Sequence, residues 1–500
     1  MNKELTRLVK HSGIYGLGTA LSKSVGFIMI PVYTRFLTPK DYGILELLDL
    51  ALFVSTTFAA MGIYGAIFRF YAAYESEKDK KEVIATALLY SSTASLLVGL
   101  ALICWGFPIA GVLLGNTSLG PLVRIVGCTF FFSNLTEAPM AYWRAQGRTT
   151  LFVCVGLVRT LTAATSLAFF LAILKMGIRG ALYANLVTNI VWGVTLSGIV
   201  LASVPWRISK EKLTKMLRYG LPTVAWSIAG FILTFSDRLF LRYYASLSEV
   251  GVYALGYKLA GIVSIAITAP FSMAWQWQQF ELAKRQDAKA IFARVETYLL
   301  MVTTLVALGV SVLAKDMLRI MVPETFWPAA YVVPLIAASY LLFNMQYVVI
   351  SGIYINHVTS RLAIVAAITA GANLALNYLL IPRFHAMGAA VATWLSYAFQ
   401  LTLSFIAAQI TYRVAYEYKR NAMILGSAIS IYFLSRFPQL GISASVVFNL
   451  ALIMLFSGVC YLLLGAEERQ MAHQWAHAAG SGLRRAWLQS RQSAALRSPK

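Results

Sequence analysis

Residues 31–43 read PVYTRFLTPKDYG, a short segment that joins two long apolar runs, 12–35 and 42–68. Each run is long enough for a helix that crosses the hydrocarbon layer of a membrane, which takes about 20 residues. The same pattern continues along the chain, and further spans are predicted at 83–105, 119–142, 150–174, 178–201, 219–242, 249–275, 297–315, 328–351, 360–381, 386–410, 420–436 and 440–464. The sequence therefore predicts an all-α polytopic membrane protein with 14 transmembrane helices.

The composition of the chain agrees with a membrane protein. Of its 500 residues, 59% are hydrophobic and only 12% are charged, whereas soluble proteins carry about 25% charged residues. The formal net charge is +22, but Lys and Arg are the residues that keep loops on the cytoplasmic side of a membrane, so we expect no nucleic-acid partner. The four cysteines lie in apolar stretches without CxxC spacing, and we expect no disulfide framework, no metal site and no cofactor.

The distribution of Lys and Arg predicts the orientation of the chain. The two tails and the even-numbered loops hold 27 of these residues, while the odd-numbered loops hold 9. Because cytoplasmic loops carry the excess of basic residues, both termini are expected in the cytoplasm. The outer loops are all short, at roughly 15 residues or fewer, which leaves no room for a catalytic domain outside the membrane. We therefore do not expect an enzyme.

The two halves of the sequence resemble each other at an offset of 208 residues. Gly43 is matched in this way by Gly251, and Gly180 is matched by Gly388. Each half holds six predicted spans, an even number, so the halves are expected to be parallel repeats with a substrate path between them. This predicts an N-terminal lobe at 1–205, a C-terminal lobe at 206–415, two appended helices within 416–464, and a basic cytoplasmic tail at 465–500.

Several charged side chains fall inside the predicted spans, where each costs about 2.5 to 3.5 kcal/mol and so marks a candidate functional site. The cations are Lys23, Arg69, Arg124, Arg159, Arg238 and Lys258, and the anions are Glu46, Asp49, Glu137 and Asp237. The excess of cations predicts a hydrated cavity that binds an anionic ligand. Arginine is well suited to phosphate, because its planar guanidinium donates two parallel hydrogen bonds.

These charged residues differ in how far they lie from the span ends. Lys23, Arg159 and Lys258 are the deepest and are the first candidates for lining the cavity. Arg69, Glu46 and Asp49 lie near predicted interfaces and could instead extend into water. Asp237 and Arg238 could be a structural pair. Glu137 and Asp237 are candidates for coupling to H⁺ or Na⁺, although an interhelical hydrogen bond would also explain either.

Segment 31–43 resembles the first-hairpin signature of Wzx-type polysaccharide flippases, members of the multidrug/oligosaccharidyl-lipid/polysaccharide exporter superfamily. The Gly-Ala pairs at 180–181 and 388–389 and the number of spans also fit this family. The resemblance implies that undecaprenyl-diphosphate-linked oligosaccharide crosses from the cytoplasmic to the outer leaflet of the bacterial inner membrane. It further implies alternating access of a cation-lined space between two lobes, in a pathway with a glycan polymerase or glycosyltransferases that assembles O-antigen, capsule or exopolysaccharide.

Three other functions stay open at this point. A lipid II flippase would also carry a diphosphate and would have the same number of helices. A cation-coupled drug exporter of the same superfamily would need acidic residues in its cavity, and the excess of cations argues against it. A non-transporting membrane scaffold for glycosyltransferases would leave the buried cations without a role.

Overall fold

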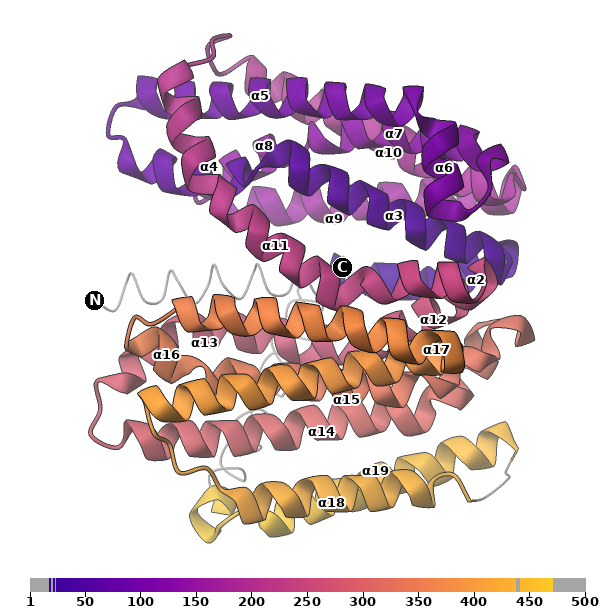
Figure 1. Cartoon of the computed structure of the whole chain (residues 1–500), viewed down its shortest axis with the longest axis vertical. Coiled ribbons are helices and arrows are strands. Elements are labelled where there is room, and N and C mark those ends of the chain that lie inside the picture. Colours follow the sequence, from indigo (N-terminus) through magenta and orange to yellow (C-terminus); the bar gives the residue numbers. More distant parts are fainter. Residues whose placement is uncertain (1–17, 19–20, 23, 438–440, 471–500) are drawn as a thin grey trace, which may run out of the picture. The chain divides into compact units, whose positions relative to one another are not determined.

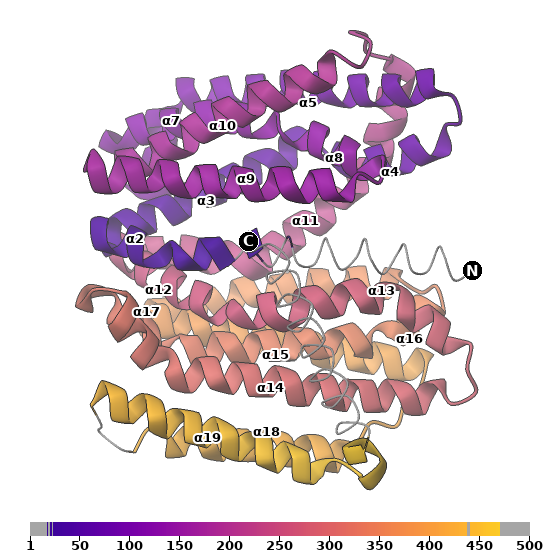
Figure 2. The ribbon, with the colours of Figure 1, turned by 180° about the vertical axis from the view of Figure 1, so that it is seen from behind.

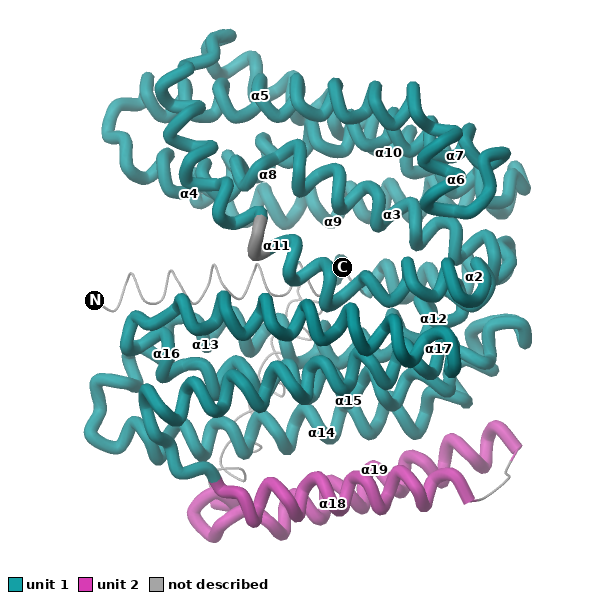
Figure 3. The backbone as a smooth tube through the Cα atoms, in the orientation of Figure 1, with its two compact units in different colours: residues 1–416 teal, residues 417–500 magenta. Residues whose placement is uncertain are grey.

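A computed structural model describes residues 18, 21–22, 24–437 and 441–470 (Figure 1). Every regular element in this part of the chain is helical, and eleven helices are long and apolar enough to cross a membrane. The protein is thus an all-helical, multi-pass membrane protein, as the apolar runs predict. The chain divides into two compact units, residues 1–416 and 417–500 (Figure 3).

The first unit contains two groups of helices, which Figures 1 and 2 show from opposite sides. We call the first group the N-terminal lobe. It consists of α2 (Ile30–Phe36), α3 (Pro39–Ala60), α4 (Ile63–Ala73), α5 (Glu77–Cys104), α6 (Gly106–Leu114), η1 (Thr117–Leu119), α7 (Gly120–Asn134), α8 (Glu137–Ala145), α9 (Thr149–Ala168), η2 (Phe169–Ile173) and α10 (Gly177–Leu201).

We call the second group the C-terminal lobe. It consists of α11 (Lys210–Tyr244), α12 (Leu247–Ala260), η3 (Ser264–Thr268), α13 (Ala269–Ala283), α14 (Ala288–Met321), η4 (Glu324–Tyr331), α15 (Val333–Val349), α16 (Ser351–Ile355) and α17 (Ser360–Thr411). The 52-residue α17 would be about 78 Å long if straight. It is in fact two helices that meet at His385, where φ is 50° and ψ is −128°, three residues after Pro382.

The long helix α11 connects the two lobes and runs diagonally between them in Figure 1. At its start, the Lys212 ammonium lies 2.7 Å from the Asp79 carboxylate and 2.6 Å from the Glu82 carboxylate, both on α5 of the N-terminal lobe. Near its other end, Ser236 donates a hydrogen bond of 3.0 Å to Asn373 on α17. One helix is therefore held by polar contacts to both lobes.

The lobes pack most closely where α3 crosses α12, and one matched glycine pair of the repeat, Gly43 and Gly251, lies at this crossing. A Cβ atom on Gly43 would lie 1.9 Å from the carbonyl oxygen of Leu247, and one on Gly251 would lie 2.0 Å from the carbonyl oxygen of Pro39. The two contacts are equivalent in the repeat, because Gly43 matches Gly251 and Pro39 matches Leu247 at the 208-residue offset. The two helices thus approach each other through a local two-fold arrangement that only glycine permits.

The starts of these two helices are also equivalent. Thr38 caps α3 by accepting a hydrogen bond from the Asp41 amide, and Ser246 caps α12 by accepting one from the Glu249 amide. Such side-chain caps satisfy amides that have no partner inside the helix. Because the caps again differ by 208 positions, the same local rule sets where both helices begin.

The second unit contains α18 (Tyr418–Leu434) and α19 (Ile442–Leu463), which pack against each other. Arg420 joins the start of α18 to the segment after α19, with 2.9 Å to Glu417 and 2.5 Å to Glu468. This pairing closes the helical hairpin at one end.

Candidate functional site

A cavity of about 340 Å³ lies between the lobes, bounded by α3, α10, α12 and the segment around α2. We call it the interlobe cavity. Its polar lining residues are Tyr33, Tyr42, Glu46, Asp49, Asn185 and Lys258, and most of its other lining is aliphatic. The cavity therefore combines an apolar wall with a small number of charged groups, which is the usual make-up of a ligand site.

One carboxylate of the N-terminal lobe binds two cations of the C-terminal lobe at the edge of this cavity. Glu46 on α3 accepts from the Arg238 Nε atom at 3.3 Å, and its other oxygen lies 3.0 Å from the Lys258 ammonium. The Glu46 side chain is only 9% exposed. These two contacts link the lobes, since Glu46 belongs to one lobe and both cations belong to the other. Removing one partner from a buried ion pair of this kind is strongly destabilising.

Arg238 is the most enclosed of the predicted cations that the structure describes, with a side chain that is 2% exposed. Its Nη1 atom donates to Asp237 at 2.9 Å and to the Thr234 carbonyl oxygen at 2.8 Å. Its guanidinium also lies 4.3 Å from the centre of the Tyr257 ring, a distance at which a cation is attracted to the ring face. Arg238 therefore holds α11, α12 and α3 together.

Asp237 is likewise fully paired. Besides Arg238, its carboxylate accepts from the Tyr253 hydroxyl at 2.5 Å and from Thr393 at 3.4 Å. A neighbouring network joins Ser236, Asn373, Asn377 and Ser396 through hydrogen bonds of 3.0 to 3.1 Å. These polar residues of α11 and α17 thus pair with one another, and Asn377 Oδ1 is left without a hydrogen-bond partner in the described part of the chain.

Lys258 differs from Arg238 because its side chain is 46% exposed. The ammonium lines the interlobe cavity and lies 4.8 Å from the centre of the Tyr42 ring. Asp49, one turn after Glu46, also lines the cavity and is exposed. A ligand in the cavity would therefore meet an accessible ammonium with two carboxylates beside it.

Arg159 on α9 forms a second polar cluster, inside the N-terminal lobe. Its guanidinium donates to Thr136 at 2.9 Å and to Asn189 at 3.1 Å, and Glu137 is close enough to act on it electrostatically. The structure shows no ion pair for Arg159 within residues 24–437. Neutral acceptors therefore orient a half-buried guanidinium that has five N–H donors in all.

Comparison with known proteins adds to this geometry. A sequence profile described as "Polysaccharide biosynthesis protein" matches residues 8–276, more than half of the chain. The chain belongs to the polysaccharide biosynthesis protein family. This is a family of membrane flippases for polysaccharide biosynthesis rather than of enzymes, and the match confirms the family that segment 31–43 resembles.

Two curated relatives are each 23% identical to the chain. One is protein 1 of the Lsg locus of Haemophilus influenzae, matched over 278 residues, or 53% of this chain and 64% of the relative. The other is the "Probable low-salt glycan biosynthesis flippase Agl15" of Haloferax volcanii, matched over 302 residues, or 57% of this chain and 59% of the relative. The match thus spans about three fifths of the length of these relatives.

Solved structures show the same fold. A lipid II flippase, MurJ, in an inward closed conformation aligns with a TM-score of 0.73 at 11% identity, covering 89% of this chain and 98% of that one. An inward-facing multidrug resistance transporter of the MATE family, in the MOP superfamily, aligns with a TM-score of 0.59 at 14% identity, covering 80% and 94%. At such low identity these alignments describe the fold alone.

Within this family fold, two other predicted cations, Arg124 and Arg69, lie away from the interlobe cavity. Arg124 on α7 is exposed, donates to the Ile103 carbonyl oxygen at 3.1 Å, and lies 4.6 Å from the Phe107 ring. Arg69 on α4 is exposed and lies 4.6 Å from the Tyr219 ring. Lys23 falls outside the described residues. Of the predicted cations that are described, Lys258 alone lines the interlobe cavity.

Sequence reasoning counted Glu46 and Asp49 among the anions inside the spans, but it placed them near a membrane interface and gave them no role in the cavity or in ion coupling. The structure places both at the interlobe cavity, with Glu46 as the acceptor for two cations. The repeat held a signal that would have found them. If Gly43 and Gly251 are read as a helix crossing, then Glu46, one turn along α3, must face α12.

Proposed function

We propose that this protein carries undecaprenyl-diphosphate-linked oligosaccharide from the cytoplasmic to the outer leaflet of the bacterial inner membrane by alternating access. The observation that carries the proposal is the accessible Lys258 ammonium in the interlobe cavity of a member of this family. An ammonium on the wall of a partly apolar cavity attracts phosphate oxygens. The glycan biosynthesis flippase of Haloferax among the relatives supports the same substrate class.

The mechanism follows from exchange of the partner of Lys258. Without substrate, Lys258 binds Glu46 and so joins the two lobes. A lipid diphosphate that enters the cavity competes with Glu46 for this ammonium, while Glu46 keeps its contact with Arg238. Substrate binding therefore removes one of two ionic links between the lobes and favours their separation, which is the differential interaction that a conformational change requires.

The remaining charged residues take different roles in this proposal. Arg159 and Lys23 are further cations on the path of the diphosphate, and Arg69 and Arg124 act at the membrane interfaces. Asp49 joins Glu137 and Asp237 as a candidate for coupling to H⁺ or Na⁺, because its carboxylate is exposed in the cavity. Outward movement of an anion is favoured by an inside-negative potential, by about 2.3 kcal/mol per charge per 100 mV.

We also propose fourteen crossings with both termini in the cytoplasm. Three crossings add to the eleven long helices: the segment at Ser24–Phe36, the second half of α17 after His385, and the 17-residue α18. In this orientation the α3–α12 crossing and Glu46 lie in the outer half of the membrane. The contacts there support an outward-closed state.

The test is translocation by the purified protein in liposomes. Undecaprenyl-diphosphate-linked trisaccharide is placed in both leaflets, and its accessibility to an added glycosidase reports flipping; lipid II and a cationic dye are run in parallel. We expect the trisaccharide lipid to be flipped, and Lys258→Gln to slow it about tenfold while Lys284→Gln, which removes an exposed lysine, leaves the rate unchanged. If the protein flips only lipid II, or transports only the dye, the proposed substrate is wrong.

A further inference from the structure

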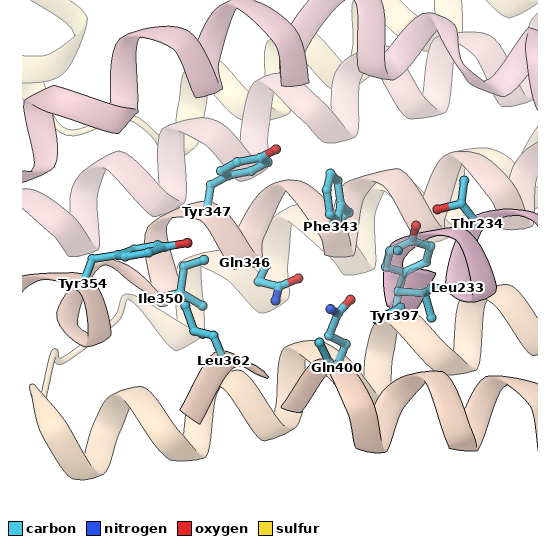
Figure 4. A pocket seen from close by; sticks show the side chains of 13 residues that line it. Leu233, Thr234, Phe343, Gln346, Tyr347, Ile350, Tyr354, Leu362, Tyr397 and Gln400 are labelled. Carbon is cyan, nitrogen blue, oxygen red and sulfur yellow. The ribbon is translucent and has the colours of Figure 1, made fainter. Parts of the chain in front are cut away.

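A second cavity, of about 330 Å³, lies inside the C-terminal lobe, and we call it the C-lobe pocket (Figure 4). It is bounded by α11, α15, α16 and both halves of α17. Its volume is at the lower end of the range of about 300 to 1,000 Å³ for small-molecule sites. The residue Gly230 lines the pocket and is exposed, and a Cβ atom there would meet nothing within 4 Å. The pocket therefore has an open side at Gly230.

Aromatic rings form much of the pocket wall. Phe343, Tyr347, Tyr354 and Tyr397 all line it. The Phe343 ring packs edge-on against Tyr347 at 5.4 Å and against Tyr397 at 5.6 Å between centroids. Edge-on contacts of this kind hold rings in fixed orientations. The pocket thus presents rigid apolar faces, each tyrosine adding a hydroxyl that can both donate and accept.

Two amide side chains point into the space between these rings (Figure 4). Gln346 on α15 donates its amide hydrogen to Ser404 at 3.2 Å, which fixes the orientation of its carbonyl oxygen. Gln400 on α17 is 8% exposed, and its Oε1 atom is buried without a hydrogen-bond partner in the described part of the chain. A buried acceptor of this kind costs free energy until a donor reaches it. The pocket therefore has an acceptor that a ligand can satisfy.

The lining of the pocket carries no charge. None of its lining residues is Lys, Arg, His, Asp or Glu. A diphosphate would find no cation there, a cationic drug would find aromatic faces but no carboxylate, and a polyprenyl chain would leave the amides unsatisfied at a cost. The ligand that fits is neutral, has apolar C–H faces for the rings, and has hydroxyls that both donate and accept.

From this chemistry we propose that the C-lobe pocket binds a neutral sugar residue of the glycan that the protein carries. The inference rests on the proposed function for the identity of that glycan. The pocket is joined to the charged network through Thr234, which lines it and whose carbonyl oxygen accepts from Arg238 at 2.8 Å. The sugar site and the charged network beside the interlobe cavity thus share helix α11.

The test is binding of free sugars to the full-length protein in lipid nanodiscs free of sugar detergents. The probes are the methyl glycosides of glucose, galactose, mannose and N-acetylglucosamine, detected by saturation-transfer NMR, with pyrophosphate and tetraphenylphosphonium as separate ligands. Two variants change the pocket: Gln400→Leu removes the unpaired acceptor at similar size, and Gly230→Phe obstructs the open side. Gln278→Leu, an exposed glutamine on α13, is the matched control, and thermal unfolding shows that each variant is folded.

We expect at least one glycoside to bind the unaltered protein and the Gln278→Leu variant. Its affinity should fall about tenfold in Gln400→Leu, the effect of one well-made hydrogen bond, and further in Gly230→Phe. The proposal is overturned if no glycoside binds, if both pocket variants bind as well as the control, or if tetraphenylphosphonium binds at the pocket instead. Flipping measured on the same preparations separates the two ideas: transport without sugar binding refutes the pocket alone, and sugar binding without transport refutes the proposed function alone.

Discussion

Replacing Glu46 by Gln should shift the protein toward an outward-open state. The substitution keeps the size of the side chain but removes the charge that binds Arg238 at 3.3 Å and Lys258 at 3.0 Å across the lobes. Removing one partner of a buried ion pair costs about 3 to 5 kcal/mol. The effect here should be smaller, because Arg238 keeps Asp237 at 2.9 Å and the Lys258 side chain is 46% exposed.

We therefore expect a loss of about 2 kcal/mol from the outward-closed state, which changes the ratio of closed to open molecules roughly 30-fold. Spin labels are placed at Asn116→Cys and Glu324→Cys, exposed positions of the two lobes in loops that the proposed orientation puts outside the membrane. Pulsed electron resonance, in a background without native cysteines, reports the opening. The distance distribution should gain a longer component in Glu46→Gln.

The matched control is Glu211→Gln, whose partner Lys215 lies 2.5 Å away on the same exposed helix face. This substitution removes an ion pair without touching the lobe contact, so its distance distribution should match that of the unaltered protein. The reasoning is refuted if Glu46→Gln is folded and its outer distances are unchanged, or if both variants shift equally.

Three further outcomes are expected. Gly43→Ala should lower stability by about 1 to 3 kcal/mol in thermal unfolding, because its Cβ would lie 1.9 Å from a carbonyl oxygen. The control Gly156→Ala should not lower it, because a Cβ at Gly156 would meet nothing within 4 Å. Equal melting temperatures of the two variants would contradict the close crossing of α3 and α12. Arg159→Gln should slow flipping about tenfold, and Arg159→Lys should slow it less, since lysine keeps the charge but cannot donate two parallel hydrogen bonds. If both variants flip the lipid as fast as the unaltered protein, the charge of Arg159 is not used. A membrane-impermeant maleimide should label Asn116→Cys from outside the cell and Gln286→Cys only after permeabilisation; the reverse would overturn the orientation.

The fold was largely predictable because a membrane leaves few choices. Apolar runs of about 20 residues must be helices when they cross hydrocarbon, since no water is present to satisfy the backbone. The division of α17 illustrates this: two predicted spans, 360–381 and 386–410, meet at His385 in the structure. The break inside the predicted span 42–68 was not predicted. The separation of α3 from α4 depends on a left-handed Met61–Gly62 pair, and no apolar count reveals it.

The charged residues were harder to place than the helices. Periodicity shows which residues share a helix face but not which helix that face meets. Arg238 and Lys258 were predicted as cavity cations, yet both bind the same carboxylate of α3, and Arg124 packs on Phe107 within its own lobe. The partner of a charged side chain depends on which helices pack against each other. The repeat indicates such a helix contact only at Gly43 and Gly251. The neutral C-lobe pocket has no charged residue to mark it in the sequence at all.

The most direct test of the account is whether the phosphorylated head group of the substrate passes through the interlobe cavity. A photoreactive benzoylphenylalanine replaces either Asn185, which lines the cavity, or Val194, which is 56% exposed on the same helix α10. Liposomes are irradiated during flipping of a lipid-linked oligosaccharide that carries its radiolabel on the sugar. The account predicts label on the protein with the probe at position 185 and little at position 194. Strong labelling at 194 with none at 185, in protein that still flips the lipid, would contradict it.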